Sequence, residues 1–245
     1  MSAIPDPETA PPVEPVGAVD ALFGERADTA RRFCAHLATS AVARGLIGPR
    51  EIPRLWERHL LNCAAIAERV PGNATLVDVG SGAGLPGLAV AIARSDVRVT
   101  LVEPLQRRVA WLEEVIDDLS LTRVEVLRAR AEDLVGKVHA DVVTARAVAA
   151  LPVLTRLCLP LVRPGGHFLA VKGRSAAEEL ASAVPELRLL GAVAWEVLTC
   201  GDGVLSEPTT VVEITAGEMP RLTGKRGRRT KATTPKSRGG SRRPR

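Results

Sequence analysis

The sequence predicts a doubly wound α/β fold: a mostly parallel, seven-stranded sheet with an added helical segment at its amino-terminal side. Three observations support this prediction. Short apolar runs alternate with helical patterns from residue 75 onward, a glycine-rich turn joins the first run to the next helix, and 46% of the 245 residues are apolar. Strands separated by helices form parallel sheets covered on both faces. A chain of this size can bury one such domain.

The chain before the first strand has a helical pattern. Apolar residues at three-and-four spacing predict an amphipathic helix over residues 20–46. A second helix is predicted over residues 51–70, because Pro53 is tolerated in a first helical turn and Pro71 with Gly72 ends the pattern. These two helices form the predicted amino-terminal extension.

Strands and helices then alternate to the end of the predicted domain. Five strands are expected at residues 75–79, 97–102, 124–127, 140–144 and 167–171, and two more within 189–198 and 210–214. Helices are expected to begin at Pro86 and Leu105 and to span residues 151–162 and 176–183. The carboxyl ends of the parallel strands form the edge where such folds bind ligands.

The net charge of +5 hides two contrasting tails. Residues 221–245 hold eleven of the 33 Lys and Arg and no acid, which leaves 22 basic and 28 acidic residues, or −6, in residues 1–220. We expect this basic tail to be disordered and to bind a polyanion such as RNA, or else to act only as a solubilising end. Residues 1–19 are acidic and proline-rich and are also expected to be disordered. The folded domain is then residues 20–220, divided into a helical part (20–72) and an α/β core (73–220).

Several function classes are disfavoured by the composition. No apolar run of 18 residues and no leader-like amino terminus is present, so we expect a cytoplasmic protein without membrane contact, and we expect a monomer. The four cysteines are scattered without a C-x-x-C pair, which disfavours a zinc ribbon, a redox motif or a disulfide framework. They are interpreted as core residues, and no metal site is predicted.

The most informative segment is T-L-V-D-V-G-S-G-A-G-L-P-G, residues 75–87. It describes a strand that leads into a glycine turn and then a helix. Gly80, Gly82 and Gly84 permit positive φ angles and let a ligand approach bare backbone, while the next helix begins with unpaired N–H groups. A cofactor of nucleoside size is expected at this turn.

Two cofactors fit the glycine turn. Residues 82–87 match G-x-G-x-x-G, and Glu103 follows about 20 residues later, as in a dinucleotide site. Asp78 favours a cationic ligand instead, because a carboxylate is unfavourable beside a pyrophosphate. The segment also resembles D-x-G-x-G-x-G, the first motif of class I S-adenosylmethionine methyltransferases, which implies that Glu103 binds the ribose hydroxyls. We prefer S-adenosylmethionine; an NAD(P)-dependent oxidoreductase is the alternative.

Arg146 is the candidate catalytic residue, since it follows the fourth strand in T-A-R-A (144–147). The chain has no Pro-Cys pair for attack on a pyrimidine and no Asn/Asp-Pro-Pro-aromatic turn at this position. Guanine N7 carries no proton and needs neither base nor nucleophile, and arginine commonly binds the N7/O6 edge. Arg146 could hold O6, bind the cofactor carboxylate, or only pair with Asp141 or Glu103.

Five motifs together resemble the glucose-inhibited division protein B family, also called ribosomal small-subunit methyltransferase G, over about residues 20–215. They are G-L-I-G-P-R-E-I-P-R-L-W-E-R-H-L-L-N-C (45–63), D-V-G-S-G-A-G-L-P-G-L (78–88), R-A-R-A-E-D-L (128–134), T-A-R-A (144–147) and the K-G of residues 172–173. The resemblance implies S-adenosylmethionine-dependent methylation of N7 of one guanine in the decoding-region loop of 16S rRNA, with the rRNA or the small ribosomal subunit as partner.

The resemblance also assigns residues. It places cofactor contacts at Gly80, Leu85, the Ala131-Glu132 pair and Arg146. One departure is visible: relatives often continue their Arg-His helix with Asp-Ser, whereas this chain has Asn62-Cys63.

RNA contacts are less well specified by the sequence. The candidates are Arg58, His59 and Lys172, each of which could equally have a structural or solvent-exposed role. Two other functions stay open. A methyltransferase of this fold could act on another RNA site or a small molecule, or the chain could bind ribosomes without catalysis.

Overall fold

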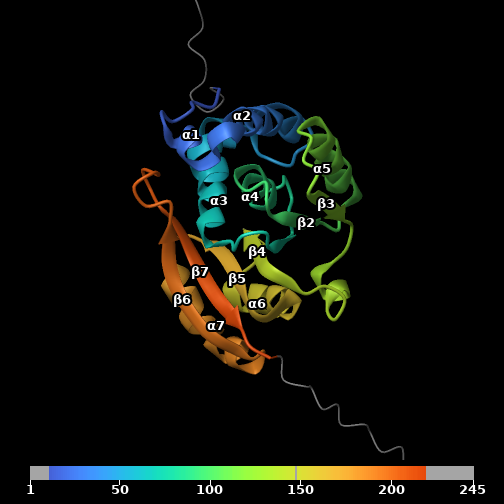
Figure 1. Cartoon of the computed structure of the whole chain (residues 1–245), viewed down its shortest axis with the longest axis vertical. Coiled ribbons are helices and arrows are strands. Elements are labelled where there is room, and N and C mark those ends of the chain that lie inside the picture. Colours follow the sequence, from blue (N-terminus) through green and yellow to red (C-terminus); the bar gives the residue numbers. More distant parts are fainter. Residues whose placement is uncertain (1–10, 147, 219–245) are drawn as a thin grey trace, which may run out of the picture.

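A seven-stranded sheet forms the centre of the protein (Figure 1). The computed structural model describes residues 11–146 and 148–218. The strand order is β3-β2-β1-β4-β5-β7-β6, and β7 runs antiparallel to the other six strands. The strands are β1 (Thr75–Val79), β2 (Arg98–Val102), β3 (Val124–Leu127), β4 (Ala140–Arg146), β5 (Val162–Lys172), β6 (Ala192–Cys200) and β7 (Thr209–Ala216). The predicted doubly wound, mostly parallel sheet is confirmed.

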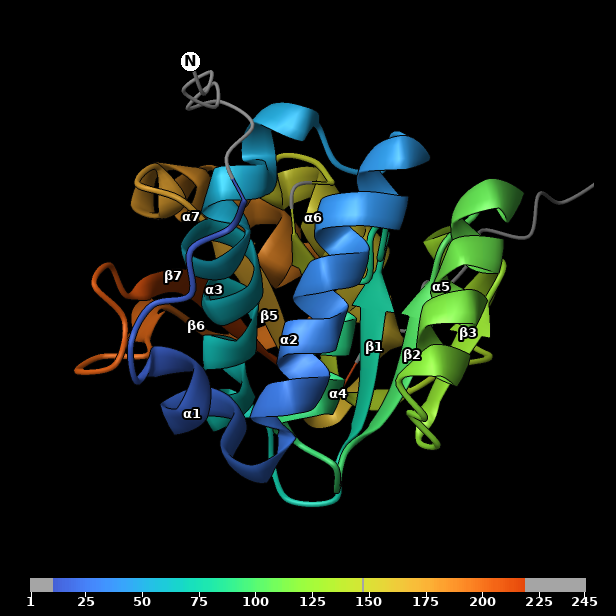
Figure 2. The same ribbon diagram turned by 90° about the horizontal axis from the view of Figure 1, so that it is seen from above.

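Helices cover both faces of the sheet (Figures 1 and 2). One face packs on α4 (Gly87–Ala93), α5 (Gln106–Asp118) and the amino-terminal helices, and the other on α6 (Leu151–Cys158) and α7 (Ala176–Leu189). Alternation along each strand divides the core accordingly: Leu76 belongs to the first apolar cluster and Val77 to the second. The two-sided burial explains why the strands read as nearly continuous apolar runs.

The amino-terminal extension is helical but is broken into more pieces than the pattern predicts. The single helix predicted over 20–46 is α1 (Ala18–Phe23), a 3₁₀ turn (Gly24–Arg26) and α2 (Ala27–His36), which continues with wider turns (Leu37–Ala41). The break lies at Gly24, whose φ of +52° leaves the α-helical region. Apolar periodicity indicates which face of a helix is buried, but it does not reveal a bend in the helix axis.

The second predicted helix, over 51–70, is a run of helical turns with different windings. It consists of η3 (Pro49–Arg54), η4 (Leu55–Leu61), α3 (Asn62–Ala64) and η5 (Ala65–Arg69). Its inner face is almost entirely inaccessible to solvent, and it packs against α4. This run places His59 and Cys63, four residues apart, on one side of the helix.

The predicted disorder before residue 20 is wrong at its inner end. Ala18 and Val19 are buried in the first turn of α1, because they pack into the apolar cluster on this side of the sheet. Glu14 accepts a charged hydrogen bond from Arg31 of α2, with the Nη2 and Oε1 atoms 2.6 Å apart. Residues 1–10 and the basic tail 221–245 lie outside the described residues.

Some other boundaries also differ from the predictions. β5 begins at Val162 instead of residue 167, because Val162 already pairs with Ala140 before an irregularity in the ladder. α7 continues past Pro185 to Leu189, and Leu187 in that extension is fully buried. None of the helices in the described ranges is both long and apolar enough to cross a membrane.

Candidate functional site

The glycine turn lies at the carboxyl ends of β1 and β2, the edge predicted for ligand binding. The backbone N–H groups of Gly80 and Ser81 donate to the Val102 carbonyl over 2.9 and 3.2 Å, which ties the turn to the end of β2. Gly80, Gly82 and Gly84 have φ angles of +74°, +57° and +76°. Side-chain-bearing residues rarely adopt these angles, so the three glycines are explained by backbone geometry.

The glycines also differ in the space around them. A Cβ on Gly84 would lie 2.4 Å from Leu88 Cδ1, and one on Gly80 would lie 2.8 Å from a Val148 methyl. Gly82 is open, since the nearest atom to its Cβ position would be a carbonyl oxygen 3.8 Å away. Gly80 and Gly84 are therefore needed for internal packing, whereas Gly82 leaves room for a ligand.

Asp78, at the end of β1, is a completely buried carboxylate. Its Oδ2 accepts a hydrogen bond from the backbone N–H of Gly87, the first residue of α4, at 2.9 Å. Its buried Oδ1 has no hydrogen-bond partner among the described residues. Burial raises the pKa of Asp78 to about 7, and the Gly87 N–H opposes that shift. A buried acceptor of this kind suits a ligand that brings a donor or a positive charge.

Glu103 follows β2 and is also buried, with 1% of its surface exposed. Its Oε2 accepts from the backbone N–H of Gly82 at 3.1 Å, and its Oε1 accepts from the Leu105 N–H at 2.9 Å. Arg108 of α5 lies 3.4 Å from Oε2. The carboxylate is thus held beside the open part of the glycine turn. Oε2 accepts from both Gly82 and Arg108, whereas Oε1 accepts only from Leu105 and keeps a free lone pair for a hydroxyl group.

The other predicted cofactor residues lie in the loops after neighbouring strands. Ala131 and Glu132 begin the 3₁₀ turn η6 (Ala131–Leu134) that follows β3, and β3 pairs with β2. Ala131 is buried and Glu132 exposed, while Leu85 in the glycine turn is half-buried. Loops after β1, β2 and β3 therefore surround one end of the sheet.

Arg146, the last residue of β4, is held by the amino-terminal extension. Its Nη1 donates to the His59 carbonyl (3.3 Å) and to Cys63 Sγ (2.7 Å), and its Nη2 donates to His59 Nδ1 (2.6 Å). Asp141 and Glu103, the alternative partners considered from the sequence, are bound to other groups. The described contacts leave the Nε–H and one Nη2–H of Arg146 for a ligand.

The contacts of His59 define its protonation. A guanidinium has no acceptor, so Nδ1 must accept the hydrogen bond from Arg146 and the ring proton must sit on Nε2. Nε2 lies 2.7 Å from Oε2 of Glu51 in η3, which accepts that proton. Burial lowers the pKa of His59, Arg146 lowers it further, and Glu51 opposes both. His59 is consequently a neutral bridge between Glu51 and Arg146.

The remaining RNA candidates occupy different environments. Arg58 is largely exposed, with its Nε 4.0 Å from Glu51. Lys172, at the end of β5, is only 9% exposed and donates to the Ala149 carbonyl (3.0 Å) and to Glu179 of α7 (2.8 Å). In this structure the Lys172 ammonium group links the loop after β4 to α7, so a phosphate contact would require it to leave these partners.

Three residues of the site were not singled out from the sequence. Glu51 lies eight positions from His59, and side chains about two turns apart do not meet in a regular helix. Cys63 was interpreted as a core residue; its spacing of four from His59 is the signal that places both on one side of the helix. Arg108 could have been found because it is a basic residue one turn into the helix that follows Glu103.

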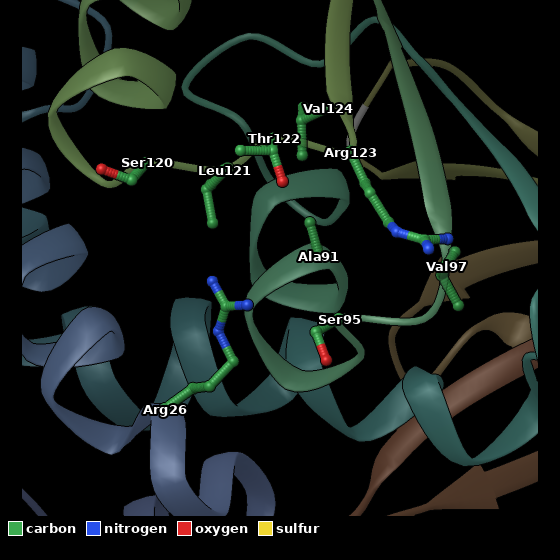
Figure 3. A pocket seen from close by; sticks show the side chains of 9 residues that line it. All are labelled: Arg26, Ala91, Ser95, Val97, Ser120, Leu121, Thr122, Arg123 and Val124. Atoms are coloured by element: carbon green, nitrogen blue, oxygen red, sulfur yellow. The ribbon is translucent and has the colours of Figure 1, made fainter.

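A small cavity of about 90 Å³ lies at the opposite edge of the sheet (Figure 3). It is lined by Ala91 and Ser95 of the α4 region, by residues 120–124 before and at the start of β3, and by Arg26. Its position at the amino-terminal ends of β2 and β3 separates it from the glycine turn, and no predicted site residue lines it.

Comparison with solved structures supports the assignment of the fold. A protein from Corynebacterium glutamicum aligns with a TM-score of 0.51 and 17% identity, covering 78% of this chain and 92% of its own. An S-adenosylmethionine-dependent O-methyltransferase from Thermotoga maritima aligns with a TM-score of 0.50 and 17% identity, covering 65% of this chain and 66% of its own. At these identities the likeness concerns the fold alone.

Sequence relatives identify the family. A family model described as rRNA small subunit methyltransferase G matches residues 26–207. Proteins named ribosomal RNA small subunit methyltransferase G from Pseudarthrobacter chlorophenolicus and Salinispora arenicola are 59% and 55% identical, covering 80% and 84% of this chain and 91% and 88% of their own. The resemblance read from the motifs is confirmed, and the chain belongs to the rRNA small subunit methyltransferase G family.

Proposed function

We propose that this protein transfers a methyl group from S-adenosylmethionine to N7 of one guanine in the decoding-region loop of 16S rRNA. The observation that carries the proposal is the meeting of two features at one edge of the sheet. The glycine turn with Asp78 and Glu103 lies after β1 and β2, and Arg146 lies at the end of β4, the strand next to β1. Membership in the family makes rRNA the substrate class.

The residues of the glycine turn fit the cofactor. The unpaired Oδ1 of Asp78 suits the positive end of the ligand, and Gly82 leaves open backbone. Glu103 can accept one ribose hydroxyl at the free lone pair of Oε1, and a second at Oε2 where that hydroxyl replaces Arg108. Leu85 and the Ala131-Glu132 pair are proposed to contact the adenosine part. S-adenosylmethionine, when bound, supplies an electrophilic methyl group on a sulfonium centre.

The acceptor side needs positioning more than proton transfer. Guanine N7 has an in-plane lone pair and no hydrogen, so the nucleophile requires no general base. Arg146 keeps an Nε–H and an Nη2–H that can donate to O6 on the same edge of the base. We propose that Arg146 fixes the base in line with the methyl group, which supplies the orientational part of catalysis.

Glu51 and His59 are proposed as positioning residues for Arg146. A guanidinium on a long side chain has many rotamers, and His59 with Cys63 restricts it through three contacts. The Glu51 carboxylate holds the imidazole in the tautomer that accepts from Arg146. The departure at Asn62-Cys63 is compatible with this role, because the thiol of Cys63 accepts the hydrogen bond.

The test is mass mapping of methylated nucleotides in 16S rRNA, free or in small ribosomal subunits, after incubation with the protein and isotope-labelled S-adenosylmethionine. One labelled 7-methylguanosine in the decoding-region loop is the expected result. Label at a different RNA position would refute the proposed site, and label only in small molecules would refute the substrate class. Thermal stabilisation by NAD(P) but not by S-adenosylhomocysteine would refute the cofactor.

The proposal also includes the location of the protein, its oligomeric state and the role of its basic tail. We propose a cytoplasmic monomer whose basic tail, residues 221–245, adds electrostatic affinity for RNA by releasing counterions. Removing the tail should weaken rRNA binding and make its salt dependence shallower, with unchanged S-adenosylhomocysteine binding. An unchanged salt slope would contradict the role of the tail.

A further inference from the structure

A large open cavity of about 1030 Å³ lies beside the proposed acceptor site. Its walls come from the segment before α1, from η3 and η4, from the loop after β5 and from the loop between β6 and β7. The segment before α1 and the β6–β7 loop lie next to each other in Figures 1 and 2. The residues lining this cavity do not include the glycine turn, Glu103 or Arg146, so it is separate from the cofactor contacts.

One helical wall separates the cavity from Arg146. Leu61 and Asn62 line the cavity, whereas the neighbouring Cys63 and the His59 carbonyl accept hydrogen bonds from Arg146 on the other side of the same run of turns. Gly173, which also lines the cavity, directly follows Lys172 at the end of β5. A polymer whose reacting base lies at Arg146 would therefore have neighbouring units within reach of this cavity.

Three arginines that line the cavity form no close ion pair with the described residues. Arg54, Arg58 and Arg174 line it, and all three are exposed. Within the described residues Arg54 and Arg174 have no ion-pair partner, and Arg58 has only the distant Glu51 contact at 4.0 Å. Other arginines form close ion pairs within the fold, for example Arg69 with Glu213 and Arg163 with Asp141.

From this arrangement we infer that the cavity binds the sugar-phosphate backbone of the nucleotides that flank the target guanine. The inference rests on the proposed function and adds a substrate subsite to it. Guanidinium groups bind phosphate oxygens through paired N–H donors, and a volume of this size exceeds that of one nucleotide. Two carboxylates, Glu57 and Glu207, also line the cavity and limit its attraction for phosphate.

The test compares three double variants of the full-length protein for binding to whichever form of 16S rRNA the unchanged protein methylates. Arg54→Gln with Arg174→Gln should weaken binding roughly tenfold and flatten the salt dependence by about 1.4 in log–log slope, since each phosphate contact on a single strand contributes about 0.7. Arg98→Gln with Arg188→Gln, two exposed arginines outside the cavity, is the matched control and should change little.

A gain of binding gives an independent readout that misfolding cannot mimic. Glu57→Gln with Glu207→Gln removes the two carboxylates of the cavity and should tighten rRNA binding two- to fivefold. S-adenosylhomocysteine binding should be the same in all variants. Equal rRNA affinity in the Arg54/Arg174 pair and its control would overturn the inference. Lack of 16S rRNA methylation by the unchanged protein would instead overturn the proposed function, so the two failures are distinct.

Discussion

The two sides of the candidate site are built in different ways. The cofactor side is local: Asp78 binds the Gly87 N–H nine positions away, and Glu103 binds the Gly82 N–H at 21 positions. The acceptor side is long-range, since Arg146 is held by His59, 87 positions away in the chain. Backbone N–H groups donate the first set of bonds, whereas the second set comes from the Arg146 side chain and two of its three bonds end on side chains.

This contrast shows where each side should be vulnerable. A glycine turn held by backbone hydrogen bonds forms when the sheet forms, so its weak points are substitutions that add atoms. The acceptor side depends on two segments that are far apart in the chain and meet at Arg146 through a few side-chain atoms. A change of one proton or one side chain can therefore release Arg146 without disturbing the sheet.

Replacing Arg146 has the largest expected effect. Arg146→Ala should lower kcat/KM for rRNA methylation by about 100-fold or more, because the base loses its orientation relative to the methyl group. S-adenosylhomocysteine should still raise the melting temperature if Arg146 acts on the base, and should do so less if it binds the cofactor carboxylate. Methyl transfer and thermal shifts measured on the same preparation separate these roles.

Two variants serve as controls for Arg146. Arg163→Ala removes an arginine that pairs with Asp141 at the surface and should leave turnover unchanged. Arg146→Lys keeps the charge but not the planar pair of donors, and should recover little activity. Near-normal turnover of Arg146→Ala would contradict both active roles of this residue.

The cofactor side is tested by adding one methyl group to the glycine turn. Gly84→Ala should lower the free energy of unfolding by about 2–4 kcal/mol, since it combines a φ of +76° with a contact of 2.4 Å to Leu88. Gly136→Ala is the matched control, because Gly136 has a φ of +75° and open space around it. It should cost only about 1 kcal/mol. Equal losses in urea unfolding would show that packing at Gly84 is unimportant.

The same contrast explains what could be predicted from the sequence. Asp78, the glycines and Glu103 follow successive strands, so their approach to one edge of the sheet follows from the topology. Arg146 was found for the same reason, because it lies at the carboxyl end of the fourth strand. Its partners could not be found in this way, because the meeting of His59 and Cys63 with Arg146 depends on how the amino-terminal helices pack on the sheet.

In the helical extension too, the sequence predicts the buried face but not the contacts between individual side chains. Apolar spacing predicts the buried face of residues 20–46 and 51–70 correctly in outline, but a bend at Gly24 or a change of winding near Leu55 leaves that spacing almost unaltered. The side-chain direction of Glu51 depends on such details. Its bond to His59 therefore had no signal in the sequence.

The acceptor side should also respond to pH through His59, with the smallest expected effect. Protonation puts a hydrogen on Nδ1, which then faces the donors of Arg146. The pKa of His59 in the folded protein is lowered from its usual 6.5, so the neutral bridge contributes stability above about pH 6.5 and is lost as the pH falls through the folded value. We expect kcat to decline in the same window.

His59→Gln isolates this titration. A glutamine amide can accept from Arg146 and donate to Glu51 but has no proton to gain. The variant should therefore lose the part of the acid decline in kcat that lies below pH 6.5. Arg58 adds positive charge near His59, and Asp78, whose pKa burial raises to about 7, interacts with Arg146. The Asp78 titration at higher pH should persist in the variant. His36→Gln, at a surface contact with Asp118, is the control and should keep the wild-type profile. Matching pH profiles in His59→Gln and His36→Gln would mean that Arg146 keeps its position without the imidazole, and the acceptor side would then be as robust as the glycine turn.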